Sequence, residues 1–342
     1  LYGGSLITLG GIMVIDILLL IIGLAFLYFG GDWLVNGSVT VAKRLKISPL
    51  VVGLSVVAFG TSAPELFVNI RAASDGHGAI SFGNIFGSNI ANIALILALC
   101  AILRPLDVHK QLVRKTIPML LAFTGLTIFM ALDPVREEHQ VAAIDAMDGT
   151  ILLVLFGCFL YLVVLSSRSE KKKFLLPGQV EEVYDFAGDY SVRTSLLIIL
   201  GSVVGLCTGA ELTVRSAIAL AQSAGIPEEV FGLVVIAFGT SLPELAVGLL
   251  ATSKGHVDLA VGNVVGSNIF NLLLIMGATS IIDNIPLPED GLQDLIVMGW
   301  LAALLYLTAL TQRRISKTEG WVLLVVYLSY IGWRFFASVA AA

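Results

Sequence analysis

The sequence predicts an all-α integral membrane protein with ten transmembrane helices, built as two inverted five-helix repeats whose motif-bearing helices are broken. Three observations predict this fold: a composition that is 57% hydrophobic and only 13% charged, ten long apolar segments, and one sequence pattern that occurs twice. The mean hydropathy of +0.94 lies far outside the range of soluble domains. A chain of this composition therefore needs the bilayer as its solvent.

Each predicted helix rests on an apolar segment of at least roughly the 20 residues that cross the hydrocarbon core of a bilayer. Several segments exceed this length, so we expect their helices to tilt or bend. The ten segments are 13–42, 47–71, 79–103, 113–132, 148–166, 192–222, 226–251, 258–282, 291–311 and 319–338.

A pattern of small and polar residues occurs in both halves of the chain at a constant offset of 179 residues. Gly60–Leu66 returns as Gly239–Leu245, and Gly83–Asn92 returns as Gly262–Asn271, with 18 of 33 positions identical across the window. The identities are mostly Gly, Ser, Thr, Asn, Pro and Glu, which packing alone would not select. Because five spans is an odd number, the second half enters the bilayer from the opposite side, which predicts an inverted-topology repeat.

The long polar connection, 167–191, is predicted to be a cytoplasmic linker, because about 25 residues cannot bury a core of their own. It separates a first five-helix repeat, 13–166, from a second, 192–342. Residues 1–12 precede the first methionine, Met13, and lack the basic start of a signal peptide. We expect them to be a leader that is either non-native or disordered.

Lys and Arg are distributed unequally between the two sides of the predicted membrane. Sixteen follow odd-numbered spans, whereas Arg71, Arg136 and Arg334 lie on the other side and Arg215 lies within a span. Cytoplasmic loops carry the excess of basic residues. This predicts a multi-pass protein of the cell (inner) membrane with both termini extracellular or periplasmic, and the short central loop favours a bacterial or archaeal source.

Each copy of the pattern places a glutamate directly after a proline in an apolar segment. Pro64 lacks an N–H and Gly60 frees the backbone, so the helix is expected to unwind near Thr61 and expose carbonyl oxygens beside Glu65. Such groups are costly in a bilayer unless they share a partner. A bound cation satisfies them together, and the second copy repeats the arrangement around Glu244.

The oxygen-rich pattern indicates the class of cation. Hard divalent ions such as Ca²⁺ accept roughly six to eight oxygens, and two carboxylates balance their charge. Zinc and copper are disfavoured because no Cys or His accompanies the motif. Ser88 and Asn92 share one helix face, as do Ser267 and Asn271, and these side chains are expected either to bind the cation or to form hydrogen bonds between helices.

Other polar groups in or beside the apolar segments favour structural roles. Asp32 and Glu211 match at the same offset and are placed near helix ends, where Glu211 has Arg215 four residues on as a partner. His77 and His256 also match, and they are expected to be interfacial turn residues rather than ligands.

The motif GTSAPEL with GNIFGSNIAN, together with its duplicate, resembles the two alpha-repeats of the sodium/calcium exchanger family, prokaryotic type, within the calcium/cation antiporter superfamily. The resemblance covers essentially the whole chain. It implies secondary active antiport of Na⁺ for Ca²⁺ by alternating access, with no enzymatic activity and no cofactor beside the transported ions. The lipid bilayer is the implied surrounding, and the sequence indicates neither a nucleic acid nor an obligatory protein partner.

Carried over position by position, the resemblance implies a calcium site of Glu65, Glu244 and the carbonyl oxygens of Thr61 and Thr240. Asn92 and Asn271 flank this centre, and some prokaryotic members carry an aspartate where this chain has Asn271. The two implied sodium sets are Ala58, Ser62, Ser88 and Glu244 on one side, and Ala237, Thr240, Ser241, Ser267 and Glu65 on the other.

Other functions are weighed against this one. A proton/calcium or potassium-dependent cation antiporter would share the fold, but protons need only the carboxylates, so the serines and carbonyls favour sodium. A passive cation channel fits two separate broken helices in inverted repeats less well than a carrier does. A membrane enzyme would need a nucleophile or substrate pocket beside the glutamates, and the sequence indicates none.

Overall fold

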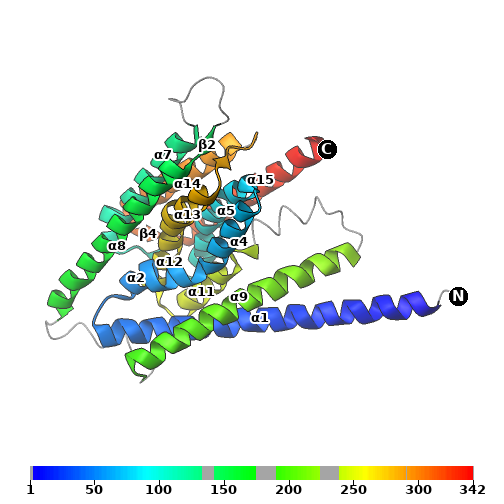
Figure 1. Ribbon diagram of the computed structural model, residues 1–342. Coiled ribbons are helices and arrows are strands. Elements are labelled where there is room, and N and C mark those ends of the chain that lie inside the picture. The colour runs from blue at the N-terminus through cyan, green and yellow to red at the C-terminus, as the bar shows by residue number, and fades with distance from the viewer. Residues whose placement is uncertain (1–2, 133–141, 175–189, 224–238, 290, 342) are drawn as a thin grey trace.

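The computed structural model describes residues 3–132, 142–174, 190–223, 239–289 and 291–341 of the 342-residue chain. The described parts of the apolar segments are helical (Figure 1), as expected where the bilayer offers the backbone no hydrogen-bond partners. The first half contains α1 (Gly3–Leu45), α2 (Pro49–Val52), α3 (Ala58–Thr61), α4 (Ala63–Ser74), α5 (Gly78–Ala91), α6 (Leu97–Leu103), α7 (Ile117–Leu132) and α8 (Ala146–Phe174). The second half contains α9 (Val192–Ser223), α11 (Leu242–Ser253), α12 (Val257–Phe270), α13 (Met276–Ile282), α14 (Gly291–Gln312) and α15 (Lys317–Ala341).

Several apolar helices are long enough to cross a membrane, which confirms the prediction of an all-helical membrane protein. Within the described residues there are seven such helices, or eight when the bent pair Pro49–Thr61 and Ala63–Ser74 is taken as one span. The predicted segment 319–338 lies in α15, and Leu242–Ser253 is the described part of segment 226–251. Ten spans in two inverted repeats stays a prediction. The seven spans are Val14–Leu45, Ile80–Leu103, Leu112–Leu132, Ala146–Ser167, Val192–Ser223, Val257–Ile282 and Gly291–Thr311.

Two helix ends differ in position from the predicted domain boundaries. Helix α1 begins at Gly3, within the segment expected to be a leader. Helix α8 continues to Phe174, into the expected linker, and residues 175–189 of that linker lie outside the described part of the chain.

Four short π-helical segments interrupt the helices of the described residues, and the sequence pattern did not predict them. They are η1 (Gly53–Val57), η2 (Asn92–Ile96), η3 (Leu112–Thr116) and η4 (Asn271–Ile275). The segments η2 and η4 start at Asn92 and Asn271, which the repeat places at equivalent positions. Single π-helical turns within α-helices often mark functional sites, so Asn92 and Asn271 are candidate functional residues.

The long helices α1 and α9 lie side by side along one edge of the bundle (Figure 1). Gly23, Gly30 and Gly37 of α1 are seven residues apart. A Cβ atom at Gly23 would lie 2.8 Å from the backbone nitrogen of Thr213, and one at Gly37 would lie 3.3 Å from the carbonyl oxygen of Ser195. The two helices are therefore antiparallel. The glycines allow the close backbone approach that is common between membrane helices.

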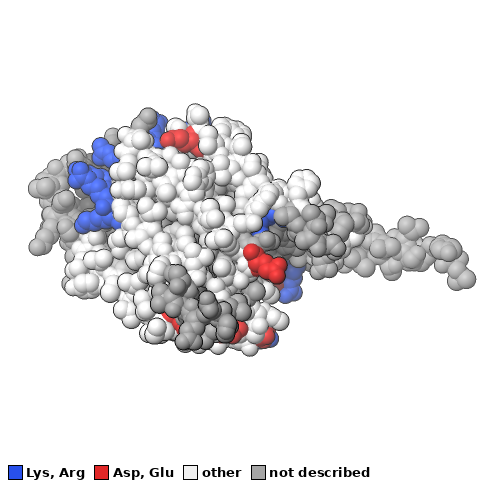
Figure 2. All heavy atoms as spheres, turned by 90° about the horizontal axis from the view of Figure 1, so that it is seen from above, with Lys and Arg blue, Asp and Glu red and all other residues white. Residues whose placement is uncertain are grey.

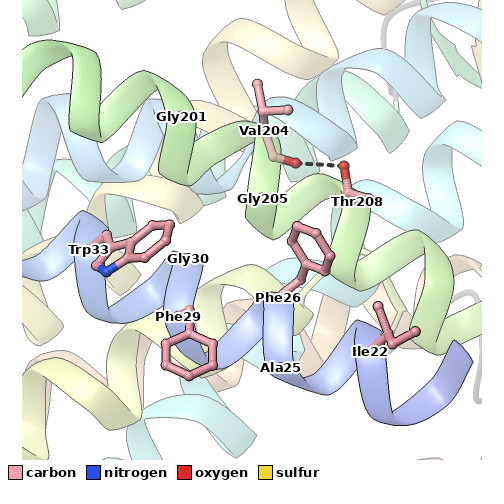
Figure 3. A pocket seen from close by; sticks show the side chains of 10 residues that line it. All are labelled: Ile22, Ala25, Phe26, Phe29, Gly30, Trp33, Gly201, Val204, Gly205 and Thr208. Carbon is pink, nitrogen blue, oxygen red and sulfur yellow. Dashed lines mark hydrogen bonds between the residues drawn. The ribbon is translucent and has the colours of Figure 1, made fainter. Parts of the chain in front are cut away.

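Beside this contact, α1 and α9 form an apolar groove of about 570 Å³. Figure 3 shows Phe26, Phe29 and Trp33 of α1 on one wall, with Val204 and Thr208 of α9 on the other. The Thr208 hydroxyl donates to the Val204 carbonyl oxygen, 2.8 Å away, so this hydroxyl is satisfied within its own helix. The groove thus presents apolar surface.

The interior of the bundle is formed by the helices that carry the second element of each motif. Every residue of α12 from Leu259 to Phe270 is buried, and the equivalent α5 and η2 are buried over most of their length. A helix that is buried on all sides belongs to a protein core. The other side of the bundle, with α7 and α8, covers this core opposite α1 and α9 (Figure 1).

Short antiparallel strand pairs join the two halves at the bundle ends. Strand β1 (Leu106–Asp107) pairs with β4 (Arg314–Ile315), and β2 (Ala143–Ile144) pairs with β3 (Ile285–Pro286). Each pair thus takes one strand from each half of the chain. Figure 2 shows charged side chains mainly near the edges of one face, with an uncharged middle, as expected for a surface in contact with lipid.

Candidate cation site

The first motif breaks a helix, as its proline predicts. Helix α3 ends at Thr61, Ser62 has φ −84° and ψ 5°, and α4 begins at Ala63 at an angle of 44° to the preceding segment. In the second half, Ser241 has φ −86° and ψ 4° before α11 begins at Leu242. The two halves therefore adopt the same local backbone at equivalent positions.

Glu65 and Glu244 are the buried charged centre of the site. Each side chain is only 1% exposed, and each lies in the first turn of the helix that follows the break, α4 or α11. Backbone N–H groups at a helix N-terminus favour a negative charge there. Two buried carboxylates nevertheless repel each other and are poorly solvated, so a bound cation would stabilise this site.

Hydroxyl groups from both halves surround Glu244. The Ser62 hydroxyl, from the first half, donates to Glu244 Oε1 at 3.1 Å, and the Ser267 hydroxyl donates to the same oxygen at 3.4 Å. Ser267 Oγ also lies 3.4 Å from Thr61 Oγ1, and the equivalent Ser88 Oγ lies 3.4 Å from Thr240 Oγ1. The two broken helices thus meet, with each half contributing to the surroundings of the other half's glutamate.

Carboxamides form two matched hydrogen bonds between the halves. Asn92 Nδ2 donates to Asn268 Oδ1 at 2.9 Å, and the equivalent Asn271 Nδ2 donates to Asn89 Oδ1 at 3.2 Å. Both bonds start at the first residue of a π-helical segment, η2 or η4. These side chains therefore form hydrogen bonds between helices, and each keeps an oxygen for a further interaction.

Several buried oxygens around the two glutamates have no hydrogen-bond partner. Buried oxygens of this kind are costly unless a ligand satisfies them. Carboxylate, amide, hydroxyl and carbonyl oxygens are the ligands of hard cations, and among the described residues no group of three or more His, Cys, Asp and Glu side chains suggests a softer metal. The unpartnered oxygens are Glu65 Oε2, Glu244 Oε2, Asn92 Oδ1, Asn271 Oδ1 and Ser241 Oγ.

Most of the residues expected to line the site lie around Glu65 and Glu244. Ala58 is fully buried, and its carbonyl accepts from the Ser62 N–H at 3.0 Å. Ala237, its expected counterpart, lies outside the described residues. Ser267 and Glu244 belong to different implied sodium sets, but the Ser267 hydroxyl donates to Glu244. The division of ligands between the two sets stays a prediction.

Four asparagines of the site were not singled out from the sequence. Asn84 Nδ2 donates to Thr240 Oγ1 at 3.1 Å, and the Thr61 hydroxyl donates to Asn263 Oδ1 at 3.1 Å. Asn89 and Asn268 complete the carboxamide pairs. All four are identical at the repeat offset within the quoted motifs, so the duplication itself carried the signal.

Two charged groups matched by the repeat, Asp32 and Glu211, have structural partners. Glu211 pairs with Arg215, as predicted from their spacing. Asp32 pairs with Lys254 at 2.5 Å, and Asn36 binds both of them. The placement of Asp32 and Glu211 near helix ends is wrong, because α1 and α9 each continue for about three turns beyond them.

His77 and His256 precede α5 and α12, as expected for interfacial turn residues. Burial lowers the pKa of His256, and the nearby positive charge of Lys254 lowers it further. His256 is therefore neutral near pH 7, and the structure places it at the start of a helix, outside the group of oxygens described above.

Comparison with known proteins identifies the family. The model of the family described as sodium/calcium exchanger protein matches residues 15–165 and 194–336. Sodium/calcium exchanger MaX1 of Methanosarcina acetivorans is 29% identical over 341 residues, with 93% of this chain and 97% of that protein covered. Inner membrane protein YrbG of Escherichia coli is 32% identical over 270 residues, with 79% and 81% covered.

A solved structure matches as well. The sodium-calcium exchanger NCX_Mj, soaked with 2.5 mM Na⁺ and 10 mM Sr²⁺, is 32% identical, superposes with a TM-score of 0.79, and matches over 94% of this chain and 99% of that one. The chain is therefore a multi-pass membrane transporter rather than an enzyme. It belongs to the sodium/calcium exchanger family.

Proposed function

We propose that this chain exchanges Na⁺ for Ca²⁺ across a bacterial or archaeal inner membrane by alternating access. The observation that carries the proposal is the pair Glu65 and Glu244, both buried, with Ser62 of one half bound to Glu244 of the other. Two carboxylates neutralise one Ca²⁺, and hydroxyl and carbonyl oxygens complete the ligand shell that this ion requires. Membership of the family supports the choice of ions.

In this proposal Ca²⁺ binds Glu65, Glu244 and the carbonyl oxygens of Thr61 and Thr240. Sodium ions bind the two sets of oxygens on either side, so that Na⁺ and Ca²⁺ compete for the same glutamates. The unpartnered oxygens of Ser241 and of both glutamates support this assignment. Asn92 and Asn271 flank the ions and hold the two halves together.

The shared glutamates provide the coupling. A bare pair of carboxylates costs several kcal/mol to hold in a low-dielectric interior, so the empty carrier crosses between its two open states slowly. A site filled with either ion is close to neutral, so the loaded carrier changes readily between its two open states. Because only one set of ions can occupy the glutamates, movement of one ion in one direction drives the other in return.

The proposal includes the membrane orientation. The excess of Lys and Arg after odd-numbered spans supports a cytoplasmic linker at 167–191 and termini on the outside. Matching backbone geometry at Ser62 and Ser241, and hydrogen bonds that recur at a 179-residue offset, support two inverted repeats around one site.

The test is ion flux in proteoliposomes that contain the purified protein. We expect Ca²⁺ uptake only when Na⁺ is loaded inside and diluted outside, and Ca²⁺ release when external Na⁺ is restored. A proton gradient alone should drive no uptake, and K⁺ should be dispensable. Uptake driven by protons would support proton/calcium exchange instead, and uptake that follows the Ca²⁺ gradient without any counter-ion would indicate a channel.

A further inference from the structure

One polar residue beside the site breaks the symmetry of the two halves. Asn69 lies one turn after Glu65 in α4 and is fully buried, whereas the repeat places Gly248 at the equivalent position after Glu244. A Cβ atom at Gly248 would lie 3.1 Å from the Ile96 side chain and 3.2 Å from Cys100 Sγ. The second half therefore has no room for a matching asparagine.

The hydrogen bonds of Asn69 have a fixed direction. Its Nδ2 lies 2.7 Å from the Glu65 carbonyl oxygen and 2.6 Å from a side-chain atom of Asn84. A backbone carbonyl only accepts hydrogen bonds, so the nearby Asn69 atom must be the amide nitrogen. The same nitrogen then requires Asn84 to present Oδ1, which turns Asn84 Nδ2 towards Thr240.

This chain of bonds sets the role of the Thr240 hydroxyl. Asn84 Nδ2 donates to Thr240 Oγ1 at 3.1 Å. Since Thr240 Oγ1 accepts this bond, one of its two lone pairs is occupied. A chain of hydrogen bonds thus runs from the Glu65 carbonyl through Asn69 and Asn84 to the Thr240 hydroxyl.

The second half makes a different arrangement with the same motif residues. There the Thr61 hydroxyl donates to Asn263 Oδ1, and Asn263 Nδ2 has no hydrogen-bond partner. With Gly248 in place of an asparagine, no group fixes the Asn263 amide. Since Asn263 presents Oδ1 to Thr61, Thr61 Oγ1 accepts no bond of the kind that Asn84 donates to Thr240.

Resting on the proposed function, we propose that Asn69 is a positioning residue that weakens Na⁺ binding at the half of the site around Glu65 and Thr240. Through Asn84 it keeps one lone pair of the Thr240 hydroxyl occupied, whereas Thr61 accepts no such bond from Asn263. The two halves thereby bind Na⁺ unequally, although their motif residues are the same.

Replacement of Asn69 tests this role. In Asn69→Ser the hydroxyl still reaches the Glu65 carbonyl four residues back but is too short to bind Asn84. The Asn84 amide can then turn and accept from the Thr240 hydroxyl, as Asn263 accepts from Thr61, which frees the Thr240 lone pair for Na⁺. The half-saturating Na⁺ concentration should fall about threefold to tenfold, the range for one ordinary hydrogen bond. That for Ca²⁺, which is bound by the Thr240 carbonyl rather than its hydroxyl, should change less.

Asn69→Gly gives the first half the glycine that the second half has at Gly248. It should also lower the half-saturating Na⁺ concentration. The matched control is Ser81→Ala. The Ser81 hydroxyl binds the Asn69 backbone carbonyl at 3.5 Å, and the repeat places Ala260 at its equivalent position. Loss of this neighbouring buried hydroxyl should leave the ratio of Na⁺ to Ca²⁺ affinity unchanged.

Flux in proteoliposomes and the rise of the melting temperature with ion concentration in detergent give two independent readouts. The shift caused by Asn69→Ser should vanish in a Thr240→Val background, because the hydroxyl it acts through is absent. An unchanged Na⁺ to Ca²⁺ ratio in Asn69→Ser, a shift that persists in Thr240→Val, or an equal shift in Ser81→Ala would overturn the inference. Absence of any sodium-dependent exchange in the unsubstituted protein would instead overturn the proposed function.

Discussion

Glu65 and Glu244 were predictable from the sequence because each follows a proline in an apolar segment, a position that packing does not explain. The asparagines around them were harder to select, because Asn84 lies one turn before Ser88 and Asn89 lies three residues before Asn92, so helix-face spacing alone does not separate ligands from packing residues. Asn69 could not be found through the repeat at all, since its equivalent is Gly248. Its role depends on which atoms two helices bring together, and only the structure gives that.

Neutralising either glutamate should stop exchange. Glu65→Gln or Glu244→Gln removes half of the charge that balances Ca²⁺ and one potential bidentate ligand. We expect sodium-dependent Ca²⁺ flux to fall at least about 100-fold, a loss typical of an essential charged ligand, while the melting temperature without ions stays equal or rises because the buried repulsion is relieved.

The control for this prediction is Glu211→Gln, which removes an exposed carboxylate in an ion pair with Arg215. Its flux should equal that of the unsubstituted protein. Near-normal Ca²⁺ transport by either Glu65→Gln or Glu244→Gln would show that the site is misassigned.

The flanking carboxamide Asn271 gives a prediction about pH. Its Oδ1 is buried without a hydrogen-bond partner, and Asn271→Asp would add a third carboxyl group near two others. Crowded carboxyl groups hold a proton more tightly. Sodium-driven Ca²⁺ flux in this variant should therefore be inhibited more strongly than in the unsubstituted protein as the pH falls. Coincident pH profiles would indicate that Asn271 only joins the helices through Asn89.

At the scale of elements, the sequence predicts the two broken helices well because proline acts locally on the backbone. The π-helical segments η2 and η4 were missed, since they leave no mark on the hydrophobic pattern and arise where a buried polar residue must meet another helix. Asp32 and Glu211 lie well within α1 and α9 rather than near their ends, although the predicted segment 192–222 matches α9 within one residue. Such errors affect positions along a helix more than the existence of the helix.

The ion pair between Asp32 and Lys254 joins α1 to the end of α11, and Asn36 binds both partners. Both charged side chains are about three-quarters buried. Reversal of one charge leaves two like charges close together, so Asp32→Lys or Lys254→Asp alone should lower the melting temperature in detergent. The double reversal should recover part of the loss.

The exposed pair Glu211 and Arg215 serves as the matched control for these reversals. Its side chains are 59% and 77% exposed, so the same charge changes there should alter the melting temperature little. Equal effects at the two pairs would show that the contact between α1 and α11 does not depend on this ion pair.

At the scale of the molecule, the duplicated motif and five apolar segments per half predict one architecture, and strand pairs β1–β4 and β2–β3 each take one strand from each half. Membership of the exchanger family and the likeness to NCX_Mj agree with this arrangement. What the sequence could not give is the asymmetry between the halves, because it resides in single contacts such as those of Asn69.

Orientation in the membrane is the property of the whole molecule that is most directly measured. Lys110 and Glu289 are both exposed, and the basic-residue count places Lys110 on the cytoplasmic side and Glu289 outside. After Cys100, Cys158 and Cys207 are replaced by Ser, Lys110→Cys in intact cells should resist a membrane-impermeant thiol reagent until the cells are opened. Glu289→Cys should react at once. Reaction of both from the same side would mean that the number of spans between them is even, and an inverted repeat of five helices would then be excluded.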